Sequence, residues 1–167
     1  MRLWVGIALL GCWAGCGGTL KLNVASSESP PKRISVLQIL TWLGEREIAK
    51  PGFQVSVGCL EAAFGRGIDA IEGQRPYVAL KSEKALDHRP PEQFFQSLAS
   101  YVPADAYIVG RGTLTKSARR LQTLSVRLIS ARTGAVLATA ELDDLGDSEL
   151  RATGTKACLA LLTGKGS

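Results

Sequence analysis

The residue types that carry catalytic or metal chemistry are sparse in this chain. Its single histidine, His88, lies in a proline-containing stretch that is typical of a loop. Residues 65–70 match the glycine spacing G-x-G-x-x-A, but they follow a predicted helix, whereas a dinucleotide fingerprint follows a strand. The acids between residues 143 and 149 lack the spacing of a calcium-binding loop. We therefore expect no enzymatic activity, no cofactor and no metal site.

Two of the four cysteines, Cys12 and Cys16, end an N-terminal segment with the features of an export signal. The segment has one early positive charge, Arg2, then an apolar run over residues 3–10 and then small residues, as secretory signal peptides do. A Cys placed after a small residue at the end of such a segment resembles a bacterial lipobox, in which the signal is cleaved before the Cys and that Cys is acylated. We expect lipidation at Cys16, because cleavage there leaves a signal of better length, with Cys12 as the alternative.

These signals divide the chain into four parts. We expect a lipoprotein signal peptide over residues 1–15 (1–11 if Cys12 is acylated), a lipid anchor and flexible linker over 16–32, a single α/β domain over 33–163 and a tail over 164–167. The linker is expected to be flexible because it is rich in serine and proline and offers little to bury.

The two remaining cysteines, Cys59 and Cys158, lie in the expected domain. Export places that domain in an oxidising compartment, where disulfides form and persist. The two cysteines therefore either form a disulfide or remain as two buried thiols that behave as small apolar residues. The sequence leaves both options open.

Composition and charge narrow the class of protein. The chain has 167 residues, 46% hydrophobic and 21% charged, which is globular rather than disordered composition. Its formal net charge is +5, and no acid occurs between Asp105 and Glu141. This stretch is expected to form a basic hairpin. We expect the hairpin and the adjoining sheet face to contact a partner; the alternative is a solvated hairpin whose Lys and Arg residues protect a sheet edge. The candidate partner-binding residues are Arg111, Lys116, Arg119, Arg120, Arg127 and Ile129.

The spacing of apolar residues predicts eight elements. Strands are expected over residues 33–40, 77–80, 106–115, 121–131 and 135–142, and helices over 53–71, 90–102 and 148–162. Gly58, Gly65 and Gly67 weaken the first of these helices, and a break is expected near Gly65. In the first helix, one apolar face is expected to consist of Phe53, Val57, Leu60, Phe64, Ile68 and Ile71. The resulting order, β-α-β-α-β-β-β-α, predicts an α/β (α+β) fold with a single mixed sheet and helices packed on it.

Two stretches carry a resemblance to a known group of proteins. Residues 104–114 (ADAYIVGRGTL) and 124–138 (LSVRLISARTGAVLA) resemble the core of a group of bacterial envelope lipoproteins and domains that includes CsgG, FlgO, LpoB and the TolB N-terminal domain. The resemblance implies a TolB N-terminal or LpoB-like fold and brings no catalytic residue. It also implies a lipid-anchored accessory protein on the periplasmic face of the outer membrane, which acts by protein–protein interaction in envelope assembly.

The expected partners follow from this resemblance. They are an unidentified envelope protein and the membrane, reached through the N-terminal lipid, with no nucleic acid; self-association stays open. The role would be LpoB-like or FlgO-like. Two alternatives remain: a lipoprotein that binds a small ligand or a peptidoglycan fragment near Trp42, and a secretion-complex component of the CsgG type.

Overall fold

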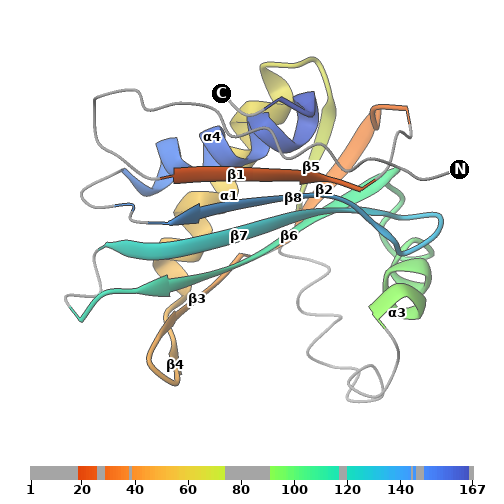
Figure 1. The fold of residues 1–167 in the computed structure, drawn as a ribbon. Coiled ribbons are helices and arrows are strands. Elements are labelled where there is room, and N and C mark those ends of the chain that lie inside the picture. Colours follow the sequence, from red (N-terminus) through yellow and green to blue (C-terminus); the bar gives the residue numbers. More distant parts are fainter. Residues whose placement is uncertain are drawn as a thin grey trace, which may run out of the picture.

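The structure, a computed structural model, contains one mixed β-sheet. It describes residues 19–25, 29–37, 39–73, 91–116, 120–143, 145 and 149–165. The strands are β1 (Thr19–Val24), β2 (Arg33–Leu37), β3 (Leu40–Leu43), β4 (Arg46–Glu47), β5 (Asp69–Gly73), β6 (Ala106–Leu114), β7 (Leu121–Ser130) and β8 (Val136–Asp143). The main path of the sheet runs β1-β8-β7-β6-β2-β5, and the β3–β4 hairpin joins it through β6 (Figure 1).

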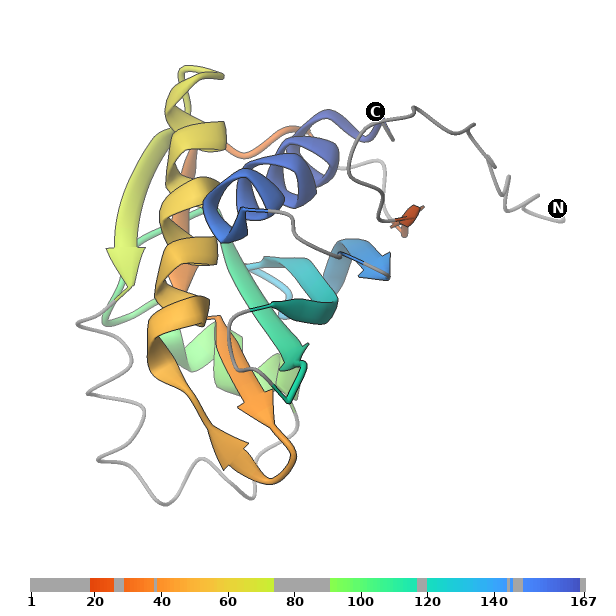
Figure 2. The ribbon, with the colours of Figure 1, turned by 90° about the vertical axis from the view of Figure 1, so that its left-hand side faces the viewer.

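Three helices of the described part pack on this sheet. They are α1 (Ala49–Phe64), α3 (Pro91–Leu98) and α4 (Leu150–Thr163). α1 and α4 lie side by side on one face, and α3 lies on the opposite face, which we call the outer face (Figures 1 and 2). The predicted fold class, a mixed α+β fold with a single sheet and packed helices, is confirmed.

The consecutive strands β6, β7 and β8 follow the prediction closely. In β7, Leu124, Val126 and Leu128 are buried, whereas Arg127 between them is exposed. This alternation places one face of β7 on the core and the other toward solvent. The turn into β8 contains Gly134 at φ 72°, a left-handed value that glycine adopts without strain.

The first half of the chain departs from the predicted strand boundaries. The expected strand over residues 33–40 is two strands, β2 and β3, which pair with different positions of β6. The expected strand over 77–80 lies outside the described residues. The place beside β2 is taken by β5, with Arg33 opposite Asp69 and an ion pair of 2.6 Å between their side chains.

Residues 19–24 form the edge strand β1, so the expectation of a flexible linker over 16–32 is wrong for this stretch. β1 pairs antiparallel with β8, and Thr19 lies opposite Asp143. Leu20 and Leu22 pack against the core, whereas Lys21 between them is exposed. This period of two is that of a half-buried strand, which explains why the stretch folds.

α1 buries a face other than its predicted apolar face. Phe53 and Phe64 are 43% and 60% exposed, and Val57 and Leu60 are only partly buried. Small residues allow α1 to approach α4 and the sheet closely, and this close packing decides which face turns inward. The buried residues of α1 are Pro51, Gly52, Val55, Ser56, Gly58, Cys59, Ala62 and Ala63.

The first helix ends at the break expected near Gly65, before the end of the predicted range 53–71. α1 stops at Phe64, and Gly67 adopts φ 70° in the turn that follows. The chain then enters β5, so Ile71 belongs to a strand and not to the helix. Gly65 and Gly67, which weaken a helix, therefore mark the end of α1.

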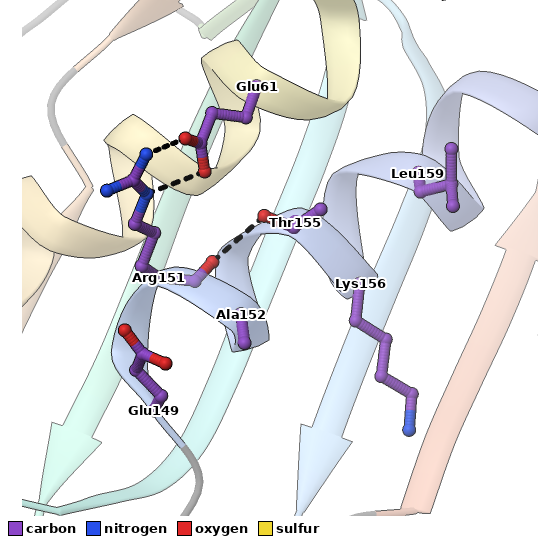
Figure 3. A pocket seen from close by; sticks show the side chains of 7 residues that line it. All are labelled: Glu61, Glu149, Arg151, Ala152, Thr155, Lys156 and Leu159. Carbon is purple, nitrogen blue, oxygen red and sulfur yellow. Dashed lines mark hydrogen bonds and ion pairs between the residues drawn. The ribbon is translucent and has the colours of Figure 1, made fainter. Parts of the chain in front are cut away.

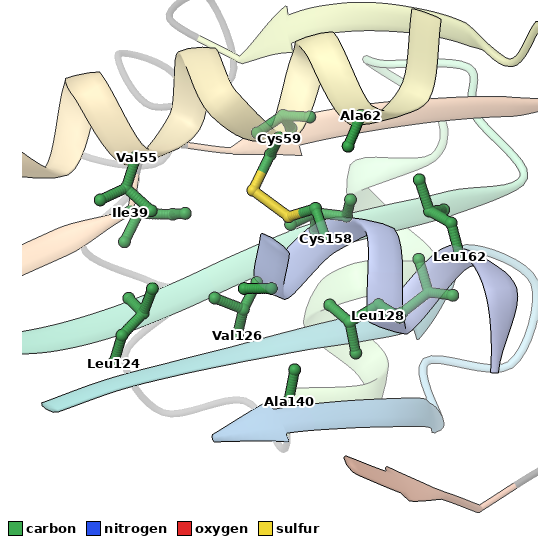
Figure 4. Packing of buried hydrophobic residues seen from close by; sticks show 14 of the residues in the cluster. Ile39, Val55, Cys59, Ala62, Leu124, Val126, Leu128, Ala140, Cys158 and Leu162 are labelled. Carbon is green, nitrogen blue, oxygen red and sulfur yellow. A yellow bond between two sulfur atoms is a disulfide. The ribbon is translucent and has the colours of Figure 1, made fainter. Parts of the chain in front are cut away.

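A disulfide joins the two helices that cover the core. Cys59 of α1 and Cys158 of α4 are bonded, with their Cα atoms 5.1 Å apart (Figure 4). Both are fully buried, and Val55, Val126 and Leu162 belong to the same apolar cluster. Of the two options left open by the sequence, the structure contains the disulfide.

A second, smaller apolar cluster lies between α3 and the outer face. Phe95 of α3 packs against Tyr107 of β6, with ring centroids 5.9 Å apart. Tyr107 is fully buried, and its hydroxyl donates a hydrogen bond of 2.9 Å to the carbonyl oxygen of Val102. Burial raises the pKa of Tyr107 to about 12.

Candidate interaction surfaces

The basic residues predicted to bind a partner fall into two groups. Arg111 and Arg127 are exposed on the outer face, where Arg111 lies opposite the residue two positions before Arg127. Such diagonal neighbours are close enough for long side chains to share one ligand. Lys116 and Arg120 are exposed at the tip of the β6–β7 hairpin, and Arg119 lies outside the described residues.

Ile129 is not available to a partner, contrary to the prediction. It is 4% exposed, because α3 covers this end of the outer face and packs Phe95 and Leu98 into the cluster that contains Ile129. The signal for this contact was the amphipathic pattern of the helix itself, since a helix with an apolar side must bury it against another element.

The uncovered part of the outer face carries Trp42 of β3. The guanidinium carbon of Arg111 lies 5.3 Å from the centroid of the Trp42 ring, which is a cation–π distance. Trp42 is partly buried, and its Nε1 has no hydrogen-bond partner among the described residues. Arg111 and Trp42 therefore form one joint feature of this face.

α1 carries an apolar row that is exposed at its two ends and partly buried in its middle. Phe53, Val57, Leu60 and Phe64 recur at i, i+4, i+7 and i+11, so they share one side of the helix. We call these four residues the α1 row. Phe53 and Phe64 are 43% and 60% exposed, and with the partly buried Val57 and Leu60 between them they form a candidate contact surface.

At one end of the sheet, the start of β1 is level with the β6–β7 hairpin, and β8 lies between them. Thr19 lies opposite Asp143, Asp143 opposite Thr123, and Thr123 opposite Thr113. These four residues cross β1, β8, β7 and β6 in one line, which we call the Thr19 row. The hairpin continues beyond this row, and Figure 2 views the molecule from this end.

A shallow groove of about 520 Å³ lies over the start of α4 (Figure 3). Arg151 of α4 donates two hydrogen bonds to the carboxylate of Glu61 on α1, so these two charges of its lining neutralise each other. In the ranges that the structure describes, no three His, Cys, Asp or Glu side chains gather as a metal site. The groove is lined by Glu61, Glu149, Arg151, Ala152, Thr155, Lys156 and Leu159.

The candidate lipidation sites, Cys12 and Cys16, lie outside the described residues, so acylation stays a prediction. Among the helices described, none has the length and apolar character needed to cross a bilayer.

The fold with these surfaces is a single mixed sheet with two helices on one face and one on the other. No family model and no curated protein matches the chain. Among solved structures, the chain is similar to PelC of Paraburkholderia phytofirmans, solved as a dodecamer, with a TM-score of 0.55 and 14% identity. The match covers 88% of this chain and 96% of PelC.

Two further solved structures are similar over a shorter part. A lipoprotein of Neisseria meningitidis matches with a TM-score of 0.50 and 15% identity, covering 66% of this chain and 78% of that one. The C-terminal domain of Salmonella enterica LpoB matches with a TM-score of 0.49 and 13% identity, covering 70% of this chain and 84% of that domain. At these identities the first two comparisons support the fold alone. The resemblance to CsgG, FlgO and the TolB N-terminal domain stays a prediction.

Proposed function

We propose that this chain is a lipid-anchored protein of the bacterial envelope that acts through protein–protein contacts, including contacts between its own copies. The observation that carries the proposal is the α1 row, because Phe53 and Phe64 expose large apolar surface to water. The lipobox-like position of Cys16 supports the anchor. The finer role is that of an accessory protein of envelope assembly, LpoB-like or FlgO-like, at the periplasmic face of the outer membrane.

The spacing of the α1 row suits a second copy of the same chain. Read from either end, its steps are four, three and four residues. A two-fold axis would set two α1 helices antiparallel, with Phe53 opposite Phe64 and Val57 opposite Leu60. Such self-complementarity is what an isologous interface requires. The dodecameric state of PelC, which is similar in fold, supports self-association as a use of this fold.

The test is the oligomeric state of the acylated protein in mild detergent, measured by native mass spectrometry. We expect assemblies of two or more copies for the wild type. The double variant Phe53→Glu with Phe64→Glu should give monomers, because it places two carboxylates in each of the two contacts between residues 53 and 64 of the paired helices. Gln54→Glu is the matched control, since Gln54 is exposed on the same helix but outside the α1 row.

Three results would count against the proposal. A wild type that is monomeric at tens of micromolar would remove self-association, and so would a double variant that assembles as the wild type does. In cells, a photocrosslinker at Phe53 that captures another envelope protein and no copy of this chain would keep the class of function but replace the partner. Unchanged far-ultraviolet circular dichroism of the double variant confirms that its fold is intact.

A further inference from the structure

The strand β1 begins close to the predicted acylation site. Cys16 lies three positions before Thr19, the first residue of β1, so only Gly17 and Gly18 separate them. Even a fully extended chain spans only about 10 Å over that distance. A lipid on Cys16 would therefore hold the Thr19 end of the sheet within about 10 Å of the bilayer surface, so the domain has no long tether.

The β6–β7 hairpin extends from the same end of the sheet. Thr113 and Thr123 lie in the Thr19 row, level with the start of β1. Lys116 is three residues beyond Thr113, and the hairpin stays paired up to Thr115, whose N–H donates to the carbonyl of Arg120 at 3.0 Å. At about 3.3 Å per residue, the tip projects up to ~10 Å past the row. The hairpin therefore extends past the Thr19 row by the same distance of ~10 Å that the chain from Cys16 to Thr19 can span. Its tip can thus reach the bilayer surface.

The charge at the hairpin tip fits an anionic surface. Lys116 and Arg120 are both exposed there. The nearest acid of the Thr19 row, Asp143, is neutralised by Lys21 at 3.4 Å. The adjacent β3–β4 hairpin adds two acids, the exposed Glu45 and the partly buried Glu47, and one exposed cation, Arg46. It therefore offsets one of the two positive charges of the hairpin tip and leaves this end of the sheet with a net positive charge from Lys116 and Arg120. Cations held at a bilayer by a short connection gain from anionic headgroups, because the connection keeps their local concentration high.

We propose that the Thr19 end of the sheet faces the bilayer and that Lys116 and Arg120 contact anionic phospholipid headgroups. This inference rests on the proposed lipid anchor at Cys16. It orients the molecule, since α3 lies toward the opposite end of the sheet and therefore faces away from the membrane (Figure 1). Tyr101, three residues after the end of α3, is exposed.

The test places a spin label on the full acylated protein in phosphatidylethanolamine vesicles that contain phosphatidylglycerol. The disulfide and the acylation leave an introduced Cys as the one free thiol of the mature chain. Gln122→Cys puts the label beside the hairpin, and Tyr101→Cys is the matched exposed site just after α3. We expect power saturation to place the Gln122 label at headgroup depth and the Tyr101 label in bulk water. Equal exposure of both labels to an aqueous relaxant would overturn the inference.

Charge variants test the headgroup contact. In the Gln122→Cys protein, Lys116→Glu with Arg120→Glu should move the label out to water, and so should vesicles of phosphatidylcholine alone. Arg127→Glu is the control, because Arg127 is equally exposed but lies in the middle of the outer face. If the depth of the label stays the same in the charge variant and in phosphatidylcholine vesicles, the proposed contact with anionic headgroups is refuted.

The mass of the purified protein separates this inference from the proposed function. A purified protein without any acyl groups would refute both the proposed lipid anchor and this inference. Acylation at Cys12 would defeat the inference alone, since seven residues would then precede β1. An acylated Cys16 with the Gln122 label in water would leave the proposed function standing and this inference refuted.

Discussion

Gly58 of α1 and Gly154 of α4 face each other across the contact between the two helices. A Cβ on Gly58 would lie 2.0 Å from the carbonyl oxygen of Arg151, and one on Gly154 would lie 2.1 Å from that of Val55. Each glycine thus admits the backbone of the other helix. This close approach also brings Cys59 within 3.6 Å of the Gly154 carbonyl oxygen and within bonding distance of Cys158.

Gly58→Ala should therefore destabilise the protein, although alanine is the better helix former. Backbone atoms stand where the methyl group would go, so the helices must separate, at a cost of about 1–3 kcal/mol or more. Urea unfolding followed by circular dichroism measures the change. Gly65→Ala is the control, because its φ is −61° and the nearest atom to its Cβ is 3.3 Å away. Equal unfolding midpoints for the two variants would contradict the packing argument.

Removal of the disulfide should lower the free energy of unfolding by about 2–5 kcal/mol, because the bond closes a long loop in the unfolded chain. The bond joins residues 99 apart in the sequence, Cys59 and Cys158. Urea unfolding with and without a reductant measures the difference. The double variant Cys59→Ala with Cys158→Ala should have a free energy of unfolding close to that of the reduced wild type, and the reductant should not change it. A wild type that ignores the reductant would show that the two thiols are not bonded.

The elements that sequence reasoning predicts well are those whose signals are local. The alternation of Leu124, Val126 and Leu128 and the glycine turn at Gly134 lie within β7, β8 and the residues between them. The buried face of α1 was not predictable in this way. One side of that helix carries large apolar residues and another side carries small ones. Which of the two sides is buried depends on the close approach of Gly154, which is far away in the sequence.

The candidate surfaces were predictable residue by residue but not as groups. Exposure of Arg111, Arg127 and Lys116 follows from their charge. Their separation into an outer-face pair and a hairpin tip depends on strand register, and the burial of Ile129 depends on where α3 docks. Sequence patterns carry neither piece of information. The strand β1 has a local signal, the alternation of Leu20 and Leu22 with polar residues, but only its pairing with β8 distinguishes it from the linker that follows it.

Tyr107 should make the protein sensitive to alkaline pH. Its pKa is raised from 10.0 to about 12 because burial disfavours the charged phenolate. A group with a raised folded pKa contributes its full stability below pH 10 and loses it as the pH rises from 10 to 12. At about 1.4 kcal/mol per pKa unit, the loss approaches ~3 kcal/mol.

Unfolding midpoints between pH 9 and 12 test this prediction. Tyr107→Phe should be less stable at pH 9 by about 1 kcal/mol, because the hydrogen bond to Val102 is lost. It should then lose less stability than the wild type above pH 10. Tyr101→Phe is the control, since Tyr101 is 68% exposed. Parallel pH profiles for the wild type and Tyr107→Phe would refute the assignment.

The pair of Arg111 and Trp42 should be visible in fluorescence. Of the three tryptophans, Trp4 and Trp13 precede Cys16, so a mature chain that begins at Cys16 reports Trp42 alone. Arg111→Ala should shift its emission to the red, because the ring loses its cover, and should cost about 0.5–1 kcal/mol of stability. Arg127→Ala should change neither quantity. An unchanged emission maximum in Arg111→Ala would show that the cation does not shield the ring in solution.

The pairing of β1 with β8 has a consequence for how the chain acquires its shape. A chain that is made or translocated N-terminus first produces β1 long before its neighbour, so Leu20 and Leu22 stay uncovered until nearly all of the domain has followed. Pairings of such long range form late, because the loop between them must first be closed. The sheet edge nearest the predicted anchor is thus the last to be completed. A chain truncated before Val136 would keep that edge as an unpaired, aggregation-prone strand.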